Sequence, residues 1–148
     1  MKKTFLIIPI LIAAQILTGC GEDKKVAPPP AKKFDLTGVK DGTYTAESSR
    51  DEKLGYSRVT LTINGGKITD ANFTGIDLFG NEKDEKYGSM LSEGDYKKAQ
   101  VAVKGIKNYP KQLVETQDLK KVDAISGASI SYGQFVETVE KAVDEAKK

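Results

Sequence analysis

One hairpin in this sequence constrains the fold most strongly. The stretch 58–63 alternates between apolar and polar residues, which predicts a β-strand with one apolar face: Val59, Leu61 and Ile63. Asn64-Gly65 follows, and this pair is a strong hairpin signal because both residues tolerate positive φ. The stretch 67–73 is therefore expected to return as an antiparallel partner strand.

Two further features complete the predicted sheet. The apolar residues of 67–73 do not keep one parity, which predicts a β-bulge near Asp70. Residues 42–47 alternate weakly and are expected to add a strand. The charged, glycine-containing stretch 76–92 predicts a long mobile loop.

The rest of the chain begins with helical periodicity. Residues 93–107 carry apolar side chains at helical spacing, and Ser92 with Asp95 is expected to cap the helix. Pro110 is expected to end this helix and to open a short second one over 112–117.

A last helix is predicted from Ser131, with Gln134 as the second member of a capping box. Its apolar stripe would contain Phe135, Val136, Val139, Ala142, Val143 and Ala146. Strands followed by helices predict an α+β fold, in which the helices pack on one face of an antiparallel β-sheet in a single small domain.

The N-terminus predicts export. Lys2 and Lys3 precede the apolar run 5–17, which is shorter than the roughly 20 residues that span a bilayer. The tetrapeptide LTGC ending at Cys20 resembles the lipobox of bacterial lipoproteins. This resemblance implies a signal peptide over 1–19, acylation of Cys20, and a lipid-anchored protein on the extracytoplasmic face of the membrane. The other interpretation is an incidental thiol in an uncleaved anchor.

The composition after this segment separates a tether from a domain. Residues 20–39 are charged, rich in proline and poor in large apolar side chains, which predicts a flexible lipidated tether. The domain is then expected to occupy 40–148. Without Lys2 and Lys3, the 23 basic residues become 21, equal to the 21 acidic ones, which argues against a nucleic-acid partner. The absence of histidine excludes histidine acid–base and metal chemistry.

A loop of small residues precedes the last helix. Ser126-Gly127-Ala128-Ser129 would let a ligand approach the backbone, and Gly127 can adopt positive φ. The start of a helix favours an anion, so a hydroxyl here suits a phosphate group. An ordinary serine-rich cap is the alternative interpretation.

The stretch from Asp123 to Ser129, DAISGAS, resembles the flavinylation motif of FMN-binding domain proteins. That motif has Asp, two variable positions, Ser or Thr, Gly, Ala, and then Thr or Ser. Further segments resemble the same family in the same order: Asp41-Gly42-Thr43-Tyr44, Gly55-Tyr56-Ser57, Asn64 to Asp70, and Val122-Asp123.

The resemblance implies a covalent cofactor. In this family a flavin transferase uses FAD and Mg²⁺ to join FMN through its phosphate to the last hydroxyl of the motif, which here is Ser129. Asp123 matches the acidic position, and the small positions are matched by Ser126, Gly127 and Ala128. Asp123 as a simple turn residue is the alternative. Serine stands where threonine is commoner. Two tyrosines are candidates to stack on the flavin ring, Tyr56 and Tyr132.

These inferences together predict a membrane-anchored electron carrier rather than a stand-alone enzyme. It would accept electrons from a membrane flavin or quinone system and pass them to an extracytoplasmic acceptor, with the redox chemistry supplied by FMN. Two other classes stay open. One is a small FMN-dependent reductase, and the other is a non-redox surface lipoprotein that uses the fold for ligand binding or structure.

Overall fold

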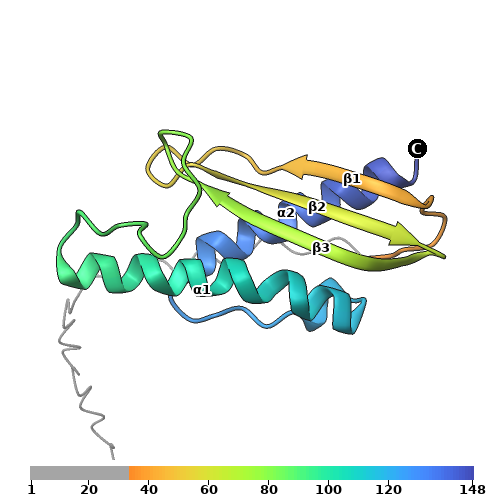
Figure 1. Ribbon diagram of the computed structural model, residues 1–148. Helices are drawn as coiled ribbons and strands as arrows, with labels where there is room; N and C mark the ends of the chain where they lie inside the picture. The colour runs from red at the N-terminus through yellow and green to blue at the C-terminus, as the bar shows by residue number, and fades with distance from the viewer. Residues whose placement is uncertain (1–33) are drawn as a thin grey trace, which may run out of the picture.

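The computed structural model describes residues 34–148, in which a three-stranded antiparallel sheet is followed by two long helices (Figure 1). The expected signal peptide and the acylated Cys20 lie outside these residues. The elements are β1 (Gly42–Glu47), β2 (Tyr56–Asn64), β3 (Lys67–Ile76), α1 (Glu93–Thr116), the short 3₁₀ helix η1 (Leu119–Lys121) and α2 (Ser129–Ala146).

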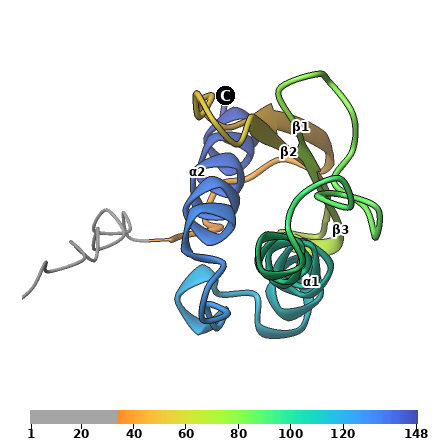
Figure 2. The same ribbon diagram turned by 90° about the vertical axis from the view of Figure 1, so that its left-hand side faces the viewer.

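The sheet follows the predicted alternation. Its order is β1-β2-β3, and both strand pairs are antiparallel. The apolar face of β2 is fully buried, whereas Arg58 on its other face is exposed. Both helices pack on the same side of the sheet (Figure 2), α2 against β1 and β2 and α1 against β3. The predicted α+β fold is therefore confirmed.

The β2–β3 hairpin confirms the predicted bulge and shifts the predicted turn by one residue. Pairing passes from Thr62 with Asp70 to Ile63 with Ile68, so one residue of β3 is extra and Ile68 faces the core. The two turn residues are Gly65 and Gly66, both with positive φ, because Asn64 still pairs with Lys67. The hairpin is therefore confirmed, but its two central residues lie one position later than predicted, and Gly-Gly is also a pair that primed turns favour.

The expected break at Pro110 is wrong. Helix α1 runs without interruption to Thr116 with Pro110 inside it, although proline removes one helical hydrogen bond. Tyr109 and Leu113 on either side are fully buried, and the Tyr109 ring packs on Tyr132 and Phe135. Burial of this turn in the core outweighs the local preference of proline. The cap at the start of α1 is confirmed, since the Ser92 side chain accepts the Asp95 N–H at 3.3 Å.

The predicted capping box of the last helix is also wrong. Helix α2 begins at Ser129, and Ser131 is a buried residue of its first turn. The Gln134 side chain does not reach back to the N-cap, because its amide group forms hydrogen bonds with β2 and the residue before that strand. It accepts from Ser57 Oγ at 2.8 Å and donates to the Gly55 carbonyl at 3.2 Å. The predicted apolar stripe of this helix is buried as expected.

Two segments outside the regular elements complete the fold. Residues 77–92 contain turns and one isolated bridge, and several bonds tie them to α1. Tyr96 Oη donates to Glu85 O at 2.8 Å, Gln100 Nε2 donates to Tyr87 O at 2.9 Å, and Lys107 pairs with Glu85. The mobility of this loop stays a prediction. Before β1, three residues placed in the expected tether pack against the core: Phe34, Leu36 and Val39. Core packing therefore begins before Lys40.

Candidate functional site

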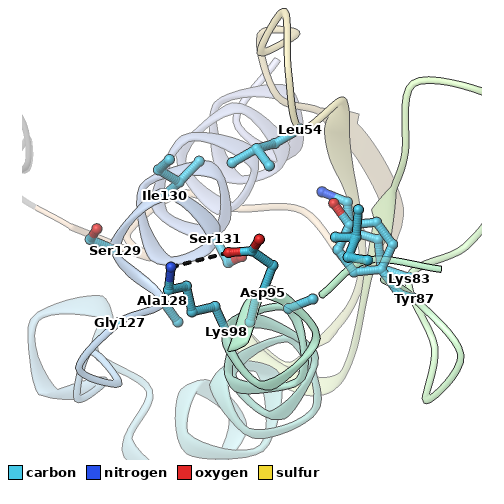
Figure 3. A pocket seen from close by; sticks show the side chains of 13 residues that line it. Leu54, Lys83, Tyr87, Asp95, Lys98, Gly127, Ala128, Ser129, Ile130 and Ser131 are labelled. Atoms are coloured by element: carbon cyan, nitrogen blue, oxygen red, sulfur yellow. Dashed lines mark hydrogen bonds and ion pairs between the residues drawn. The ribbon is translucent and has the colours of Figure 1, made fainter. Parts of the chain in front are cut away.

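A cavity of about 340 Å³ opens where α2 begins (Figure 3). This volume lies at the lower end of the range for small-molecule sites. Four parts of the chain meet there: the loop between β1 and β2, the loop between β3 and α1, the first turns of α1, and the start of α2. The lining residues are Leu54, Lys83, Tyr87, Leu91, Asp95, Lys98, Ala99, Ala102, Gly127, Ala128, Ser129, Ile130 and Ser131.

The N-terminus of α2 is uncapped. Its N-cap residue is Ala128, which has no side chain that could accept a hydrogen bond. The first amide that bonds back is that of Tyr132, which donates to Ala128 O at 2.9 Å. Among residues 34–148, the three preceding amides of the helix have no acceptor. Such amides, together with the helix dipole, favour an anion at this position.

Gly127 shapes the approach to these amides. Its φ is +85°, in the left-handed region that side chains disfavour. A Cβ built here would lie 3.5 Å from Val101 Cγ1, an ordinary contact, so backbone conformation rather than space requires glycine. This turn allows Ala128 N–H to bond to Ile125 O at 2.9 Å and starts the helix two residues before Ser131.

The two serines of the first turn have different surroundings. Ser129, the first residue of α2, is exposed, and its hydroxyl points away from the cavity (Figure 3). Ser131 lines the cavity and is buried. An exposed hydroxyl at the rim is accessible to a modifying enzyme, and rotation about one side-chain bond changes where it points. Ser129 is therefore the more accessible of these two acceptors.

The walls of the cavity are largely apolar. Leu54, Leu91 and Ile130 contribute aliphatic side chains, while Ala99 and Ala102 of α1 leave room between them. Ile130 is 49% exposed and Leu91 58% exposed, so apolar surface continues from the cavity to solvent. Apolar walls with a few polar groups are typical of sites that bind flat organic ligands.

One wall carries Lys83 and Tyr87, which lie opposite the start of α2 (Figure 3). Lys83 is 8% exposed, and its ammonium lies 5.3 Å from the centre of the Tyr87 ring. Burial lowers the pKa of Lys83, and the more distant Asp51 and Asp77 offset part of that shift. Burial raises the pKa of the Tyr87 hydroxyl, and the same two carboxylates raise it further.

A second pair of charges lies on the α1 side. Lys98 Nζ and Asp95 Oδ1 are 3.1 Å apart, with both side chains mostly exposed. The Ser92 hydroxyl and then Lys98 lower the pKa of Asp95. Because an exposed pair of this kind contributes little to stability, Lys98 is free to exchange Asp95 for another anion.

The structure brings some of the predicted site residues together and leaves others apart. Gly127, Ala128 and Ser129 line the cavity, whereas Ser126 and Asp123 stand outside its lining on the preceding loop. The Asp123 N–H donates to Gln112 Oε1 at 2.9 Å, and its charge adds to the burial that raises the pKa of Tyr132.

Neither predicted ring-stacking tyrosine lines this cavity. Tyr56 is 9% exposed and has the Arg50 guanidinium 4.0 Å from its ring centre. Tyr132 packs edge-on against Tyr109, with ring centres 5.5 Å apart. The tyrosine that does line the cavity is Tyr87, so the roles of Tyr56 and Tyr132 in binding stay predictions.

Sequence reasoning missed the Lys83 wall and Ile130. The charged, glycine-containing stretch 76–92 predicts a long mobile loop, and nothing in it indicates a binding wall. The loop contains a lysine and a tyrosine four residues apart, but this spacing indicates a binding site only once the loop is known to fold back on α1. Ile130 was not predicted as a cavity residue, because the sequence predicts that the last helix begins after it, at Ser131.

A second hollow of about 400 Å³ lies on the other side of Ile130, lined by Ser49, Arg50, Asp51, Ile130, Gly133, Gln134, Val136, Glu137 and Glu140. Its charged side chains do not pair with one another. Asp51 accepts from the backbone amides of Lys53 and Leu54, both at 2.8 Å, and Glu140 Oε1 is buried with no hydrogen-bond partner among residues 34–148. Glu137 accepts from the Ser49 hydroxyl at 2.7 Å and from Lys141 at 2.8 Å. Within residues 34–148 no cluster of side chains is suited to hold a metal ion, and no helix is long and apolar enough to cross a membrane.

The sequence profile of the FMN-binding domain family matches residues 55–144, which include β2, β3, α1, most of α2 and every residue that lines the cavity except Leu54. This chain belongs to the FMN-binding domain family. The match confirms the predicted family and supports FMN as the cofactor of a flavoprotein.

Two solved structures are similar to this chain. A crystal structure of the CPE2226 protein from Clostridium perfringens is 26% identical, covers 74% of this chain and 89% of its own, and superposes with a TM-score of 0.59. A solution structure of a protein from Clostridium thermocellum is 28% identical, with coverage of 74% and 94% and a TM-score of 0.43. No curated protein matches the chain.

The residues present fit FMN. Three unpaired amides and the nearby Lys98 suit its phosphate, and apolar walls suit its ring. The buried Lys83 suits the polar edge of the ring, where oxygen and nitrogen atoms accept hydrogen bonds.

Proposed function

We propose that this protein is a membrane-anchored, extracytoplasmic electron-transfer flavoprotein that carries FMN in phosphoester linkage to Ser129. The observation that carries the proposal is the motif residue Ser129 itself. It offers an exposed hydroxyl on the first turn of an uncapped helix, at the rim of an apolar cavity. Family membership supports FMN as the cofactor.

The attachment step is a phosphoryl transfer. The Ser129 oxygen forms a bond to the phosphorus of the FMN half of FAD, the pyrophosphate bond breaks, AMP leaves, and the hydroxyl proton passes to a base of the transferase. The chain's contribution is to present the hydroxyl and to surround the product with unpaired amides. These amides and Lys98 would bind the phosphodiester, which retains one negative charge.

When bound, FMN supplies reversible electron transfer, and the domain supplies position and environment. Leu54, Leu91 and Ile130 would exclude water from part of the ring while leaving an edge accessible to partners. The proposed donor is a membrane flavin or quinone system and the proposed acceptor is extracytoplasmic. Acylation of Cys20 would hold the carrier near that donor, and covalent attachment would prevent loss of FMN outside the cytoplasm.

Co-expression with a flavin transferase tests the proposal. The wild-type protein should give a fluorescent band on a denaturing gel and a peptide containing Ser129 heavier by one FMN moiety. Ser129→Ala should abolish this label, and Ser129→Thr should retain it, because threonine provides the same nucleophilic oxygen. Ser89→Ala is the matched control, since it removes an exposed hydroxyl outside the motif and should leave the label in place.

The outcomes separate the alternatives. A label that persists in Ser129→Ala and maps to Ser126 or Ser131 would refute the acceptor while keeping a flavoprotein. A wild-type protein that never acquires flavin beside an active transferase would refute covalent attachment and favour a non-redox role. Membrane fractionation of Cys20→Ala tests the anchor, which is refuted if the variant is still processed and acylated.

A further inference from the structure

Lys83 is a buried cation without an ion-pair partner. Among residues 34–148, the salt bridges involve Arg58 and the lysines at 97, 98, 107, 141 and 148, all of them on substantially exposed side chains. Lys83 is 8% exposed and takes part in none of them. Its nearest aromatic contact is Tyr87, and its electrostatic partners Asp51 and Asp77 act without direct contact.

The position of this lysine is fixed by the sheet. Lys83 N–H donates to Gly75 O at 2.8 Å, which attaches the loop to the end of β3. A Cβ at Gly75 would lie 3.0 Å from Lys83 Cδ and 2.6 Å from Ile106 Cδ1. Because Gly75 has no side chain, the aliphatic part of the Lys83 side chain can pass close to it and reach the cavity.

Burial of an ammonium without a partner is unfavourable, since the ion loses hydration and gains no ion pair in return. The group opens onto a cavity rather than into the core, because Lys83 is one of the lining residues. A ligand that brings negative charge into the cavity would supply the missing interaction. The phosphate does not fit this role, because its expected position is at the opposite wall, beside Ser129 (Figure 3).

Resting on the proposed function, we propose that Lys83 faces the flavin ring and stabilises the negative charge that the ring acquires on reduction. A quinol donor releases two electrons and two protons as it is oxidised to the quinone. The flavin ring takes up both electrons and one proton and so gains one negative charge, while the second proton goes to solvent. The ammonium of Lys83 is thus a tuning group for the midpoint potential, and Gly75 is its positioning residue.

The charged groups around Lys83 are consistent with this role. Asp51 lies before β2, and Asp77 lies directly after β3. Tyr87 is on the same loop as Lys83, and Asp95 is paired with Lys98 across the cavity. None of these carboxylates forms an ion pair with Lys83, so its charge remains available to a ligand. The apolar walls keep the effective dielectric constant low and make a single charge count for more than it would in water.

The experiment compares flavinylated wild-type protein with Lys83→Met, which keeps the length of the side chain and removes its charge. Both are loaded by co-expression with the transferase and titrated with dithionite beside a reference dye. In the variant, the preference of the site for reduced over oxidised flavin should fall by roughly tenfold, which lowers the midpoint potential by about 30 mV for a two-electron couple. Lys86→Met, an exposed lysine on the same loop, is the matched control and should leave the potential unchanged.

A second measurement does not depend on redox chemistry. Acylation of amines followed by peptide mass spectrometry should label Lys83 several-fold more slowly in flavinylated wild-type protein than in flavin-free Ser129→Ala. Equal labelling, or an unchanged potential in a fully loaded Lys83→Met protein, overturns the inference while the proposed function stands. Absence of flavin from the wild-type protein overturns the proposed function instead. If Lys83→Met fails to fold, Lys83→Gln is titrated in its place with the same expected direction.

Discussion

The two ends of helix α2 differ in how completely they are packed and hydrogen-bonded. From Phe135 to its C-terminus the helix is packed, because Phe135, Val139 and Ala142 are fully buried in the core; this stretch is called the packed end. At its N-terminus, three amides have no acceptor among the described residues, and Ile130 is half exposed. The other exposed large apolar residues of 34–148 are on the loop facing that end: Leu78, Phe79, Met90 and Leu91. One end of the helix therefore stabilises the fold, and the other is left unsatisfied where a ligand would complete it.

The largest expected difference comes from the packed end. Phe135 has no exposed surface, and its ring centre lies 5.0 Å from that of Phe73 and 5.5 Å from that of Tyr109. Phe135→Ala should lower the free energy of unfolding by about 3–5 kcal/mol, because it removes buried area and leaves a cavity. Urea denaturation followed by circular dichroism measures this change. A loss below 1 kcal/mol would mean that the two ends do not differ as described.

A smaller effect of opposite sign is expected in the cavity. In flavin-free protein, Lys83→Met should raise the free energy of unfolding by about 1–2 kcal/mol at neutral pH, because it replaces an unpaired buried ion by an apolar chain. Since burial lowers the pKa of Lys83, the unfolded chain holds this proton over a pH range in which the folded protein has lost it. The contribution of Lys83 to the free energy of unfolding of the wild-type protein therefore rises with pH between the lowered pKa of folded Lys83 and its ordinary value near 10.5.

The advantage of Lys83→Met should accordingly shrink as the pH rises through that window. Parallel urea titrations at neutral and alkaline pH measure the difference between the two proteins. A gap that widens with pH would show that Lys83 is stabilised in the folded protein, contrary to its surroundings in the structure.

The smallest effect is expected on the exposed loop. Phe79 is 89% exposed, so Phe79→Ser should change the free energy of unfolding by less than about 0.5 kcal/mol. The same urea assay measures it. A loss comparable to that of Phe135→Ala would place this loop in the core and remove the distinction between the two ends.

The sequence predicted the packed end far better than the cavity. Alternation in β2 and helical spacing in α2 identify buried faces because burial repeats with the period of the element. The exceptions had tertiary causes. Burial of Tyr109 and Leu113 carries α1 through Pro110, and the sheet takes up the Gln134 side chain that the capping box required.

The candidate site was predictable only where a short motif encodes it. DAISGAS predicts Ser129 as the acceptor, which stays a prediction, whereas family membership supports FMN as the cofactor. Lys83 and Tyr87 were not identified, because their position depends on an irregular loop folding onto α1 through bonds such as Tyr96 Oη to Glu85 O. Long-range contacts of this kind leave no period in the sequence.

The bond from Lys40 N–H to Ala146 O at 2.8 Å joins the start of the domain to the last turn of α2. Ser129 is at the other end of that helix, and its 18 residues span about 27 Å. The chain therefore enters the domain beside the C-terminal end of α2, whereas the proposed FMN acceptor Ser129 lies at its N-terminal end. If Cys20 is acylated as proposed, the membrane attachment of the chain and the proposed flavin site are at opposite ends of α2.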